Sequence, residues 1–248
     1  MKTCVKWAML ALILLLVKQA QAEKIQVVGT EYPPFTQTMP DGAPGGFAFD
    51  LLRAMFDDVK FEATFELFPW KRAETMLAEE PNTLALLART EKREALYHWI
   101  GPVYPRALYL YRLKARPEVQ LNVIEDVTPY KVGVVRGYAS LTEVLNAGVP
   151  QSNLDEVAND SLNVKKLFER HVDLIPNNDM VLASLLRKEG HAFDDVERAF
   201  VITPEGKSYF YFGVSKATDA QLVQTLQQAF DALKQDGRFD KIAQQYLQ

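Results

Sequence analysis

Short apolar strands alternate with amphipathic helices along most of this 248-residue chain, and this alternation constrains the fold more than any other feature. Strands of about four to eight residues separated by helices predict an α/β architecture with largely parallel pairing. The candidate strands are Lys24–Thr30, Phe61–Phe68, Leu84–Ala88, Leu108–Leu113, Lys131–Val135, Leu154–Val157, Val172–Ile175, Phe200–Thr203 and Tyr209–Val214. The candidate helices are Phe49–Asp57, Trp70–Glu79, Ser140–Ala147, Ser161–Arg170, Asp179–Glu189, Asp219–Asp236 and Phe239–Tyr246. Loops that follow parallel strands gather at their carboxyl ends, so a ligand crevice is expected there.

The alternation is interrupted in the middle of the chain. A polar stretch, Lys-Ala-Arg-Pro-Glu, follows Leu113, and a second strand–helix series begins at Lys131. A last series begins after the turn-like sequence Thr203-Pro-Glu-Gly. This order predicts two lobes joined by two crossings. Residues 23–111 and 208–248 would form lobe 1, and residues 112–207 would form lobe 2.

The N-terminus has the pattern of a secretory signal. Lys2 and Lys6 precede an apolar run from Trp7 to Val17, and Ala20-Gln-Ala22 follows with the small residues of a cleavage site. An apolar run of about 11 residues is too short to span a bilayer. We therefore expect residues 1–22 to be cleaved and the mature protein to be periplasmic. An uncleaved membrane anchor remains the alternative.

Charge and composition exclude several classes of function. The chain has 28 basic and 32 acidic residues, and removal of the signal takes away three lysines, which leaves a net charge of −7. An acidic protein has no general affinity for nucleic acid or anionic membranes. The single cysteine, Cys4, lies within the signal, so the mature chain has no thiol chemistry. The three histidines show no metal-binding spacing, and no nucleophilic triad is readable, so neither a metal nor another cofactor is expected. A monomer is expected.

The C-terminal segment carries a resemblance to a known family. A strand ends near Val214, an amphipathic helix follows, and Gly237-Arg-Phe-Asp-Lys-Ile-Ala-Gln-Gln-Tyr246 forms a second, shorter helix. This segment resembles the C-terminal signature of the family 3 periplasmic solute-binding proteins, the polar amino acid receptors of ABC importers. The resemblance covers essentially the whole mature chain. It implies two lobes, each a mostly parallel sheet flanked by helices, and a two-strand hinge.

Two aromatic residues of lobe 1 are candidate walls of a ligand cleft. Glu31-Tyr-Pro-Pro-Phe35 follows the first strand, and the two prolines stiffen the loop that presents Tyr32. The family has a Tyr-x-Pro-Phe element here, which implies that Tyr32 contacts the ligand. Trp70 ends a similar strand-to-helix connection, and the resemblance implies an apolar wall at this position. Plain packing of both rings is the alternative.

The run Arg89-Thr-Glu-Lys-Arg-Glu94 after an apolar strand is the most diagnostic internal motif. It resembles the family's carboxylate-binding element, which implies that Arg93 forms a two-pronged ion pair with the ligand carboxylate. The planar guanidinium fits this role because its fork matches a carboxylate and keeps its charge. Thr90 would add a hydroxyl and an amide near a helix start.

The same region departs from the family pattern. Receptors for amino acids commonly carry serine or threonine in the preceding strand, where this chain has Ala85, Leu86 and Ala88. Arg89 is an additional cation that would bind a second anionic group or reach the surface. A standard pose for an α-amino acid is therefore in doubt.

Lobe 2 offers a strand, a glycine turn and a helix start at Arg136-Gly-Tyr-Ala-Ser140. Backbone amides at such a corner bind anions. The resemblance implies that Gly137, Tyr138 and Ala139 contact the ligand carboxylate from this side.

A last candidate is the sequence Asp173-Leu-Ile-Pro-Asn-Asn-Asp179. Amino acid receptors of the family usually carry an acidic residue here for the ligand ammonium. Asn178 matches that position, and Asp179 would take the role only after a one-residue shift. The alternative is that Asn178 only caps the helix that begins there.

The expected function is capture of a small polar, carboxylate-bearing ligand by hinge closure, for delivery to an ABC permease. Two alternatives remain open. The same fold hosts periplasmic cyclohexadienyl-type dehydratases, for which Glu31 would be the candidate general acid. The chain would otherwise be a ligand sensor for a membrane receptor kinase.

Overall fold

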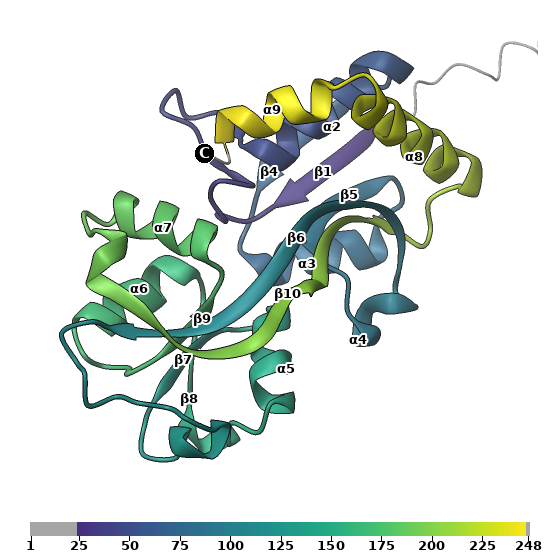
Figure 1. Ribbon diagram of the computed structural model, residues 1–248. Helices are drawn as coiled ribbons and strands as arrows, with labels where there is room; N and C mark the ends of the chain where they lie inside the picture. Colours follow the sequence, from purple (N-terminus) through teal and green to yellow (C-terminus); the bar gives the residue numbers. More distant parts are fainter. Residues whose placement is uncertain (1–23, 247–248) are drawn as a thin grey trace, which may run out of the picture.

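Two lobes joined by two long strands make up the structure, a computed structural model that describes residues 24–246 (Figure 1). The strands are β1 (Ile25–Gly29), β2 (Gln37–Thr38), β3 (Pro44–Gly45), β4 (Ala63–Leu67), β5 (Thr83–Ala88), β6 (Tyr97–Leu113), β7 (Val132–Val135), β8 (Leu154–Val157), β9 (Ile175–Asn177) and β10 (Val196–Ser215). The α-helices are α2 (Phe47–Val59), α3 (Trp70–Glu79), α4 (Glu91–Glu94), α5 (Ala139–Asn146), α6 (Asp160–Phe168), α7 (Asp179–Lys188), α8 (Ala220–Gln235) and α9 (Arg238–Tyr246). Short 3-10 helices span Ile124–Val127, Gln151–Asn153 and Phe193–Asp195. The predicted signal segment, residues 1–22, lies outside the described residues.

The predicted α/β class is confirmed. One sheet has the strand order β4-β1-β5-β10-β6-β9, and β7 pairs with β8 in a second sheet. The strands β4, β1 and β5 are parallel, as are β7 and β8. The long strand β10 is antiparallel to both β5 and β6, so the main sheet is mixed. We call the half with β1–β5, α2–α4, α8 and α9 the upper lobe, and the half with β7–β9 and α5–α7 the lower lobe (Figure 1).

The crossing between the lobes is a two-stranded ribbon. The strands β6, of 17 residues, and β10, of 20 residues, pair along most of their length and run through both lobes (Figure 1). The predicted strands Phe200–Thr203 and Tyr209–Val214 are both parts of β10. The intervening residues 204–207 form an irregularity in the ladder, because Thr203 pairs with Leu108 and Ser208 pairs with Arg106.

The upper lobe is organised around the apolar faces predicted for its helices. The side chain of Asp219 accepts hydrogen bonds from the backbone N–H groups of Gln221 and Leu222 and so caps α8. The apolar residues of α8 at helical spacing are buried, as predicted: Leu222, Leu226, Ala229, Phe230 and Leu233. Both α8 and α9 pack on α2, and all three lie on the far side of the lobe from the lower lobe (Figure 1).

The lower lobe has its own apolar core. Val132 and Val134 of β7 pack with Val144 of α5, and all three are fully buried. The isolated bridge between Val132 and Leu174 holds the chain before β9 against β7. All four residues of β7 are buried, because the strand is covered on both faces.

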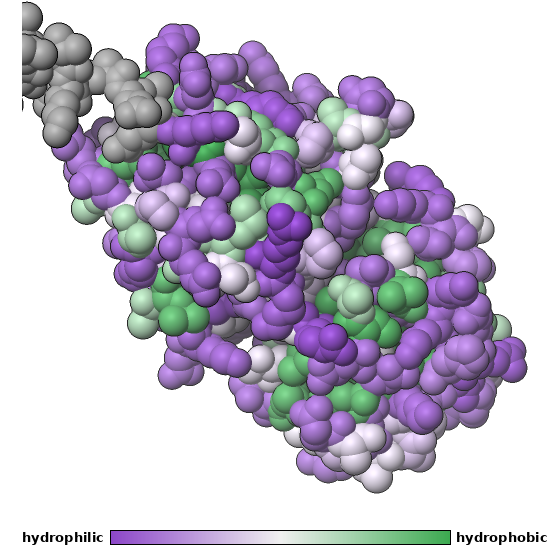
Figure 2. Space-filling model, turned by 180° about the vertical axis from the view of Figure 1, so that it is seen from behind, coloured by the Kyte–Doolittle hydropathy of each residue, from purple (hydrophilic) through white to green (hydrophobic). Residues whose placement is uncertain are grey.

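The described surface is mostly hydrophilic. The face in Figure 2 shows hydrophobic residues only in small groups between hydrophilic ones. The large apolar side chains that are exposed come from separate segments: Leu96, Val123, Leu162, Phe193 and Val201. Such scatter is ordinary for a protein surface. None of the helices in residues 24–246 combines the length and hydropathy required to cross a membrane.

Candidate functional site

A cavity of about 60 Å³ lies between the lobes beside the ribbon. This volume is well above the about 10–15 Å³ that admits one buried water, so the space can take up a small solute. The cavity is lined by both lobes and by β6 and β10 of the ribbon: Thr30, Tyr32, Thr36, Trp70, Leu86, Leu87, Ala88, Arg93, Arg106, Leu108, Tyr138, Ala139, Ser140, Asp160, Pro176, Asn177 and Phe210. The sequence predictions Tyr32, Trp70, Arg93, Tyr138 and Ala139 are therefore brought together here.

Arg93 is a buried cation with weak partners. The short helix α4 turns its side chain inward, and only 8% of the residue is exposed. Arg93 Nη2 donates to the carbonyl oxygen of Gly137 at 3.1 Å and reaches Glu74 Oε1 at 3.4 Å. Arg93 Nη1 donates to the carbonyl oxygen of Ala88 at 3.4 Å. Burial lowers the pKa of Arg93, because the charged form loses its hydration, but an arginine stays protonated. Its remaining donors suit an anion.

Trp70 reinforces the same position. Its indole ring lies 5.3 Å from the Arg93 guanidinium, and Trp70 Nε1 donates to the Gly137 carbonyl at 3.0 Å. Gly137 has φ +78°, and a Cβ atom at this position would lie 2.7 Å from Lys71 Cε. The left-handed conformation therefore suits glycine, and it presents one lower-lobe carbonyl to two donors of the upper lobe.

Tyr32 and Asn178 form a second contact between the lobes. Asn178 Nδ2 donates to the Tyr32 hydroxyl at 3.1 Å, and Asn178 Oδ1 accepts from the backbone N–H of Val181 at 2.9 Å. The asparagine thus caps α7, as the alternative interpretation predicted, and also touches a residue of the cavity wall. Burial raises the pKa of Tyr32, so the hydroxyl stays protonated.

Five predicted site residues are not among those that line the cavity. Gly137 and Asn178 contact lining residues, whereas Asp179, Arg89 and Thr90 lie away from them. Asp179 pairs with Arg198 and accepts from the Tyr111 hydroxyl. Arg89 is exposed, and its Nε donates to Glu94 Oε2 at 2.8 Å. Thr90 is the residue before α4 and makes no side-chain cap. The one-residue shift proposed for Asp179 therefore does not bring its carboxylate to the cavity.

Glu31, the candidate acid of the dehydratase alternative, is likewise outside. Its carboxylate accepts from the backbone N–H of Thr38 at 3.0 Å and lies 3.4 Å from Lys188 Nζ, with more than a third of the side chain exposed. A carboxylate in this environment faces the solvent and Lys188, so it cannot serve chemistry in the cavity.

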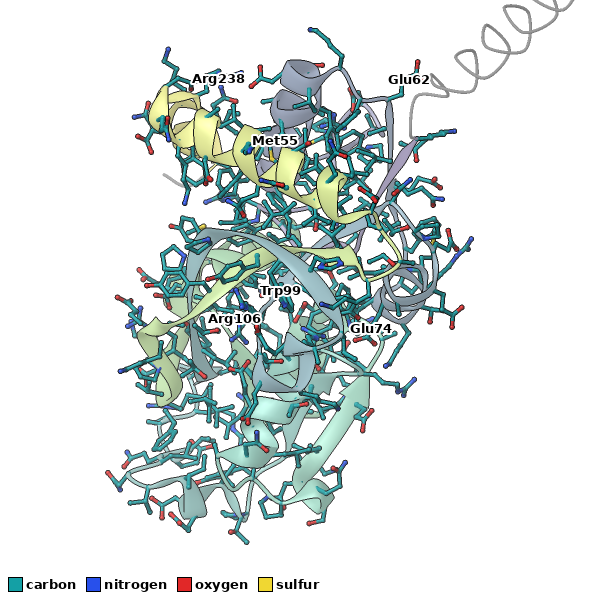
Figure 3. All side chains as sticks on the ribbon, turned by 90° about the vertical axis from the view of Figure 1, so that its right-hand side faces the viewer. Met55, Glu62, Glu74, Trp99, Arg106 and Arg238 are labelled. Carbon is teal, nitrogen blue, oxygen red and sulfur yellow. The ribbon has the colours of Figure 1, made fainter. Side chains whose placement is uncertain are left out.

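Two buried charged residues of the cavity escaped prediction from sequence. Arg106 of β6 is 4% exposed and forms an ion pair with Glu143 at 2.8 Å. Figure 3 shows Arg106 and Glu74 at the level where the two lobes meet. Asp160, the first residue of α6, is also 4% exposed. In the sequence, Asp160 looks like an ordinary acidic residue in a first helical turn, and Arg106 like a solvated residue of a strand.

The Asp160 carboxyl is poorly satisfied. Its Oδ1 accepts from Asn177 Nδ2 at the long distance of 3.5 Å, and its Oδ2 has no hydrogen-bond partner. The Tyr138 hydroxyl, which also lacks a partner of good geometry, lies close enough to lower the pKa of Asp160 slightly. Burial dominates and raises the pKa of Asp160 to about 7.

Between these charged groups the walls are largely apolar. Leu86 and Ala88 of β5, two of the positions where the resemblance implies hydroxyl groups, line the cavity together with Leu87 and with Phe210 of β10. Within residues 24–246, no group of three His, Cys, Asp or Glu side chains is arranged to hold a metal ion. The cavity is thus built to bind a small solute through a few polar groups.

Comparison with known proteins agrees with this architecture. A protein of Pseudomonas aeruginosa named L-arginine-binding protein is 26% identical over 255 residues, covering 96% of this chain and 93% of the relative. The solved structure titled an ancestral arginine-binding protein bound to arginine has a TM-score of 0.77 at 21% identity, covering 91% of this chain and 98% of the other. A histidine kinase sensor domain with similarity to periplasmic binding proteins has a TM-score of 0.81 at 17% identity, covering 92% and 97%.

The likeness to the two solved structures shows that this chain has their two-lobed fold. Sequence identity of 21% and 17% does not identify its ligand. The family model for the bacterial extracellular solute-binding proteins, family 3, matches residues 25–248. This chain therefore belongs to the bacterial extracellular solute-binding proteins of family 3.

Proposed function

We propose that this protein is a periplasmic receptor for a small carboxylate-bearing ligand, an amino acid, which it captures by closing its two lobes and delivers to an ABC importer. The observation that carries the proposal is the Arg93 guanidinium, which is buried, weakly paired and lines the cavity between the lobes. A ligand carboxylate would supply the strong bidentate partner that Glu74, at 3.4 Å, does not.

Closure would follow from contacts on both sides of the ligand. Gly137 and Asn178 of the lower lobe already touch Arg93 and Tyr32 of the upper lobe. A ligand that contacts both faces binds the closed state better and shifts the population toward it. In this proposal residues 23–111 and 208–248 form lobe 1, residues 112–207 form lobe 2, and the chain acts as a monomer after loss of residues 1–22.

A sensor function is the second candidate. The likeness to a histidine kinase sensor domain favours it, because the same closed state would then be presented to a membrane receptor instead of a permease. The Pseudomonas aeruginosa relative is named as a binding protein, which agrees with a function in binding and not in catalysis.

The test is a thermal-shift screen of the mature protein, stripped of ligand by unfolding and refolding, against the twenty L-amino acids and small organic acids. A ligand at a hundred times its dissociation constant adds about 2.7 kcal/mol to the free energy of unfolding. We expect at least one amino acid to raise the melting temperature, and isothermal titration calorimetry then gives its dissociation constant.

Arg93→Lys and Arg89→Lys form a matched pair for this screen. Both keep the positive charge and remove the planar fork, but only Arg93 lines the cavity. We expect Arg93→Lys to lose the shift and Arg89→Lys to keep it. Equal binding by both variants would contradict the role of Arg93, and the absence of any ligand in the whole panel would contradict the proposed function.

A further inference from the structure

The cavity has a second polar end that the family pattern does not supply. The position where amino acid receptors of this family usually carry an acid is Asn178, and its amide group is already used by the α7 cap and by Tyr32. Asp179 is paired with Arg198 outside the cavity. A ligand cation would therefore find no carboxylate at the usual place.

Asp160 is a carboxylate in a different place. It comes from the start of α6 in the lower lobe, and it is the one acidic residue of the described chain that lines the cavity. Its Oδ2 is buried without a hydrogen-bond partner, and the nearby Tyr138 hydroxyl is also unsatisfied. The two groups are close enough to affect each other, but their contact lacks hydrogen-bond geometry, and Asn177 is 3.5 Å from the other carboxylate oxygen. Buried polar atoms are nearly always well paired in folded proteins, so this weakly satisfied carboxylate on the cavity wall indicates a place for a donor from a bound molecule.

The charges around the cavity identify the partner's chemistry. Arg93 and Arg106 are the cations that line it, and Arg106 is neutralised by Glu143 at 2.8 Å. Asp160 has no such cationic partner. An ionised carboxylate in a low-dielectric site is costly unless a cation pairs with it. A ligand with one anionic and one cationic group would satisfy Arg93 and Asp160 together.

We propose that Asp160, assisted by the Tyr138 hydroxyl, binds the ammonium group of a zwitterionic ligand whose carboxylate is held by Arg93. This inference rests on the proposed function and specifies its ligand. The walls between the two charged residues are Leu86, Leu87, Ala88, Leu108 and Phe210, so the rest of the ligand is small and largely apolar. Asp160 thus replaces the acid that is absent at Asn178.

Binding of the ammonium group is linked to the ionisation of Asp160. The groups that face this carboxyl are Tyr138, Tyr32 and Asn177, with Arg93, Arg106 and the Arg106-paired Glu143 farther along the walls. Burial raises the pKa of both tyrosines, so neither titrates near neutral pH. Because the pKa of Asp160 is about 7 in the empty cavity, affinity for an ammonium ligand should rise about tenfold between about pH 6 and pH 8.

The test uses the mature protein and three variants, Asp160→Asn, Asp179→Asn and Arg93→Lys. The probes are alanine, leucine and phenylalanine together with propionate, isocaproate and hydrocinnamate, which are the same molecules without the ammonium group. Calorimetric titrations at about pH 6 and pH 8 give each dissociation constant. Thermal melts confirm that each variant is folded.

We expect Asp160→Asn to weaken binding of the amino acid by about thirtyfold or more, since truncation of a buried ionic partner has an effect of this size. Its binding should also become independent of pH. Asp179→Asn should bind like the wild type. The deaminated acid should bind the wild type more weakly than the amino acid does, and Asp160→Asn should not weaken it further.

The outcomes separate the two proposals. If Asp160→Asn binds the amino acid as tightly as the wild type while Arg93→Lys does not, the proposed function stands and the role of Asp160 is overturned. If affinity for the amino acid falls as the pH rises, the ligand donates no cation to Asp160, and the inference is also overturned. If none of the twenty amino acids of the screen binds the wild type, both proposals fail.

Discussion

The guanidinium of Arg93 donates a hydrogen bond across the cleft to the carbonyl oxygen of Gly137, 3.1 Å away. The two residues belong to different lobes and are 44 positions apart in the chain. Trp70 donates to the same oxygen at 3.0 Å, so one carbonyl joins the proposed carboxylate site to the opposite wall. A change at this carbonyl should therefore affect closure as well as stability.

Gly137→Ala should weaken ligand binding about tenfold or more. The substitution forces a side chain into a left-handed backbone at φ +78°, and relief of this strain displaces the carbonyl that Arg93 and Trp70 share. The close approach to Lys71 Cε is relieved by movement of that exposed lysine. Gly190→Ala is the control, because Gly190 has φ +82° and open space around it. Both variants should lose about 1–2 kcal/mol of stability in urea titrations, from the left-handed backbone alone. An unchanged dissociation constant in Gly137→Ala would show that this carbonyl does not shape the site.

Asp160→Asn should stabilise the empty protein at neutral pH and above. The pKa of Asp160 is raised from 3.8 to about 7 on folding, so the folded state binds the proton more tightly. The wild type should therefore lose about 1.4 kcal/mol of stability per pH unit as the pH rises from about 4 to 7 because of this group, and no more above that. Urea titrations of both proteins at a series of pH values measure the difference. Curves that stay parallel from about pH 5 to pH 8 would mean that Asp160 is ionised in the empty cavity.

Trp70→Phe should remove the ligand-induced change in tryptophan fluorescence. The mature chain has two tryptophans, and only Trp70 lines the cavity, while Trp99 donates from its Nε1 to the Glu94 carbonyl outside it. The phenyl ring keeps the apolar wall but loses the donor to Gly137, so affinity should fall about fivefold, the effect of one hydrogen bond of about 1 kcal/mol. Trp99→Phe serves as the comparison and should keep both the signal and the affinity. A signal lost in Trp99→Phe instead would place the reporting tryptophan outside the cleft.

Arg106→Gln should destabilise the protein by about 3 kcal/mol or more. The variant leaves Glu143, whose side chain is 18% exposed, without its ion-pair partner in the interior. The comparison is Arg136→Gln, which breaks the pair with Glu156 at 3.3 Å on the surface and should cost less than about 1 kcal/mol. Thermal and urea melts of the two variants report the difference. Similar losses would indicate that water reaches Arg106 and Glu143.

Elements with a strong period were predictable from the sequence. The helix α3 and the strand β8 have the predicted first and last residues, because each is bounded by turn residues and has a clear apolar pattern. The four-residue helix α4 is too short to show a hydrophobic period, and only the family motif indicated a helix start at Thr90. The predicted strand Val172–Ile175 begins three residues too early, because the hydrogen-bond ladder with β6 uses residues 175–177.

The two predicted strands within β10 show where local sequence misleads. The residues between them include Pro204 and Gly206, which favour turns, so the sequence indicated a break between separate strands. Pairing with β6 on both sides keeps the strand continuous around them. The continuity of β10 is therefore determined by its pairing with β6, which is distant in the sequence.

The site was predictable only where a family motif or a conspicuous residue type occurs. Arg93, Tyr32 and Trp70 line the cavity as expected. The expectation rested on the planar fork of the arginine and on the connections after strands that present the two aromatic rings. Asp160 and Arg106 were missed, because their importance comes from burial between segments distant in sequence. The sequence around each of these two residues contains no local pattern that indicates this burial.

The ribbon of β6 and β10 limits how the lobes can move. Two hydrogen-bonded strands bend easily across their flat face and resist shear within their plane, so we expect the lobes to swing along one main path. The ladder is interrupted where residues 204–207 of β10 face the single residue Ala107, and fewer hydrogen bonds oppose bending at that point. We therefore expect hinge bending to concentrate at this interruption of the ribbon. The relative orientation of the two lobes would then vary mainly by one hinge angle. Closure around a solute would therefore cost the lobes little orientational entropy.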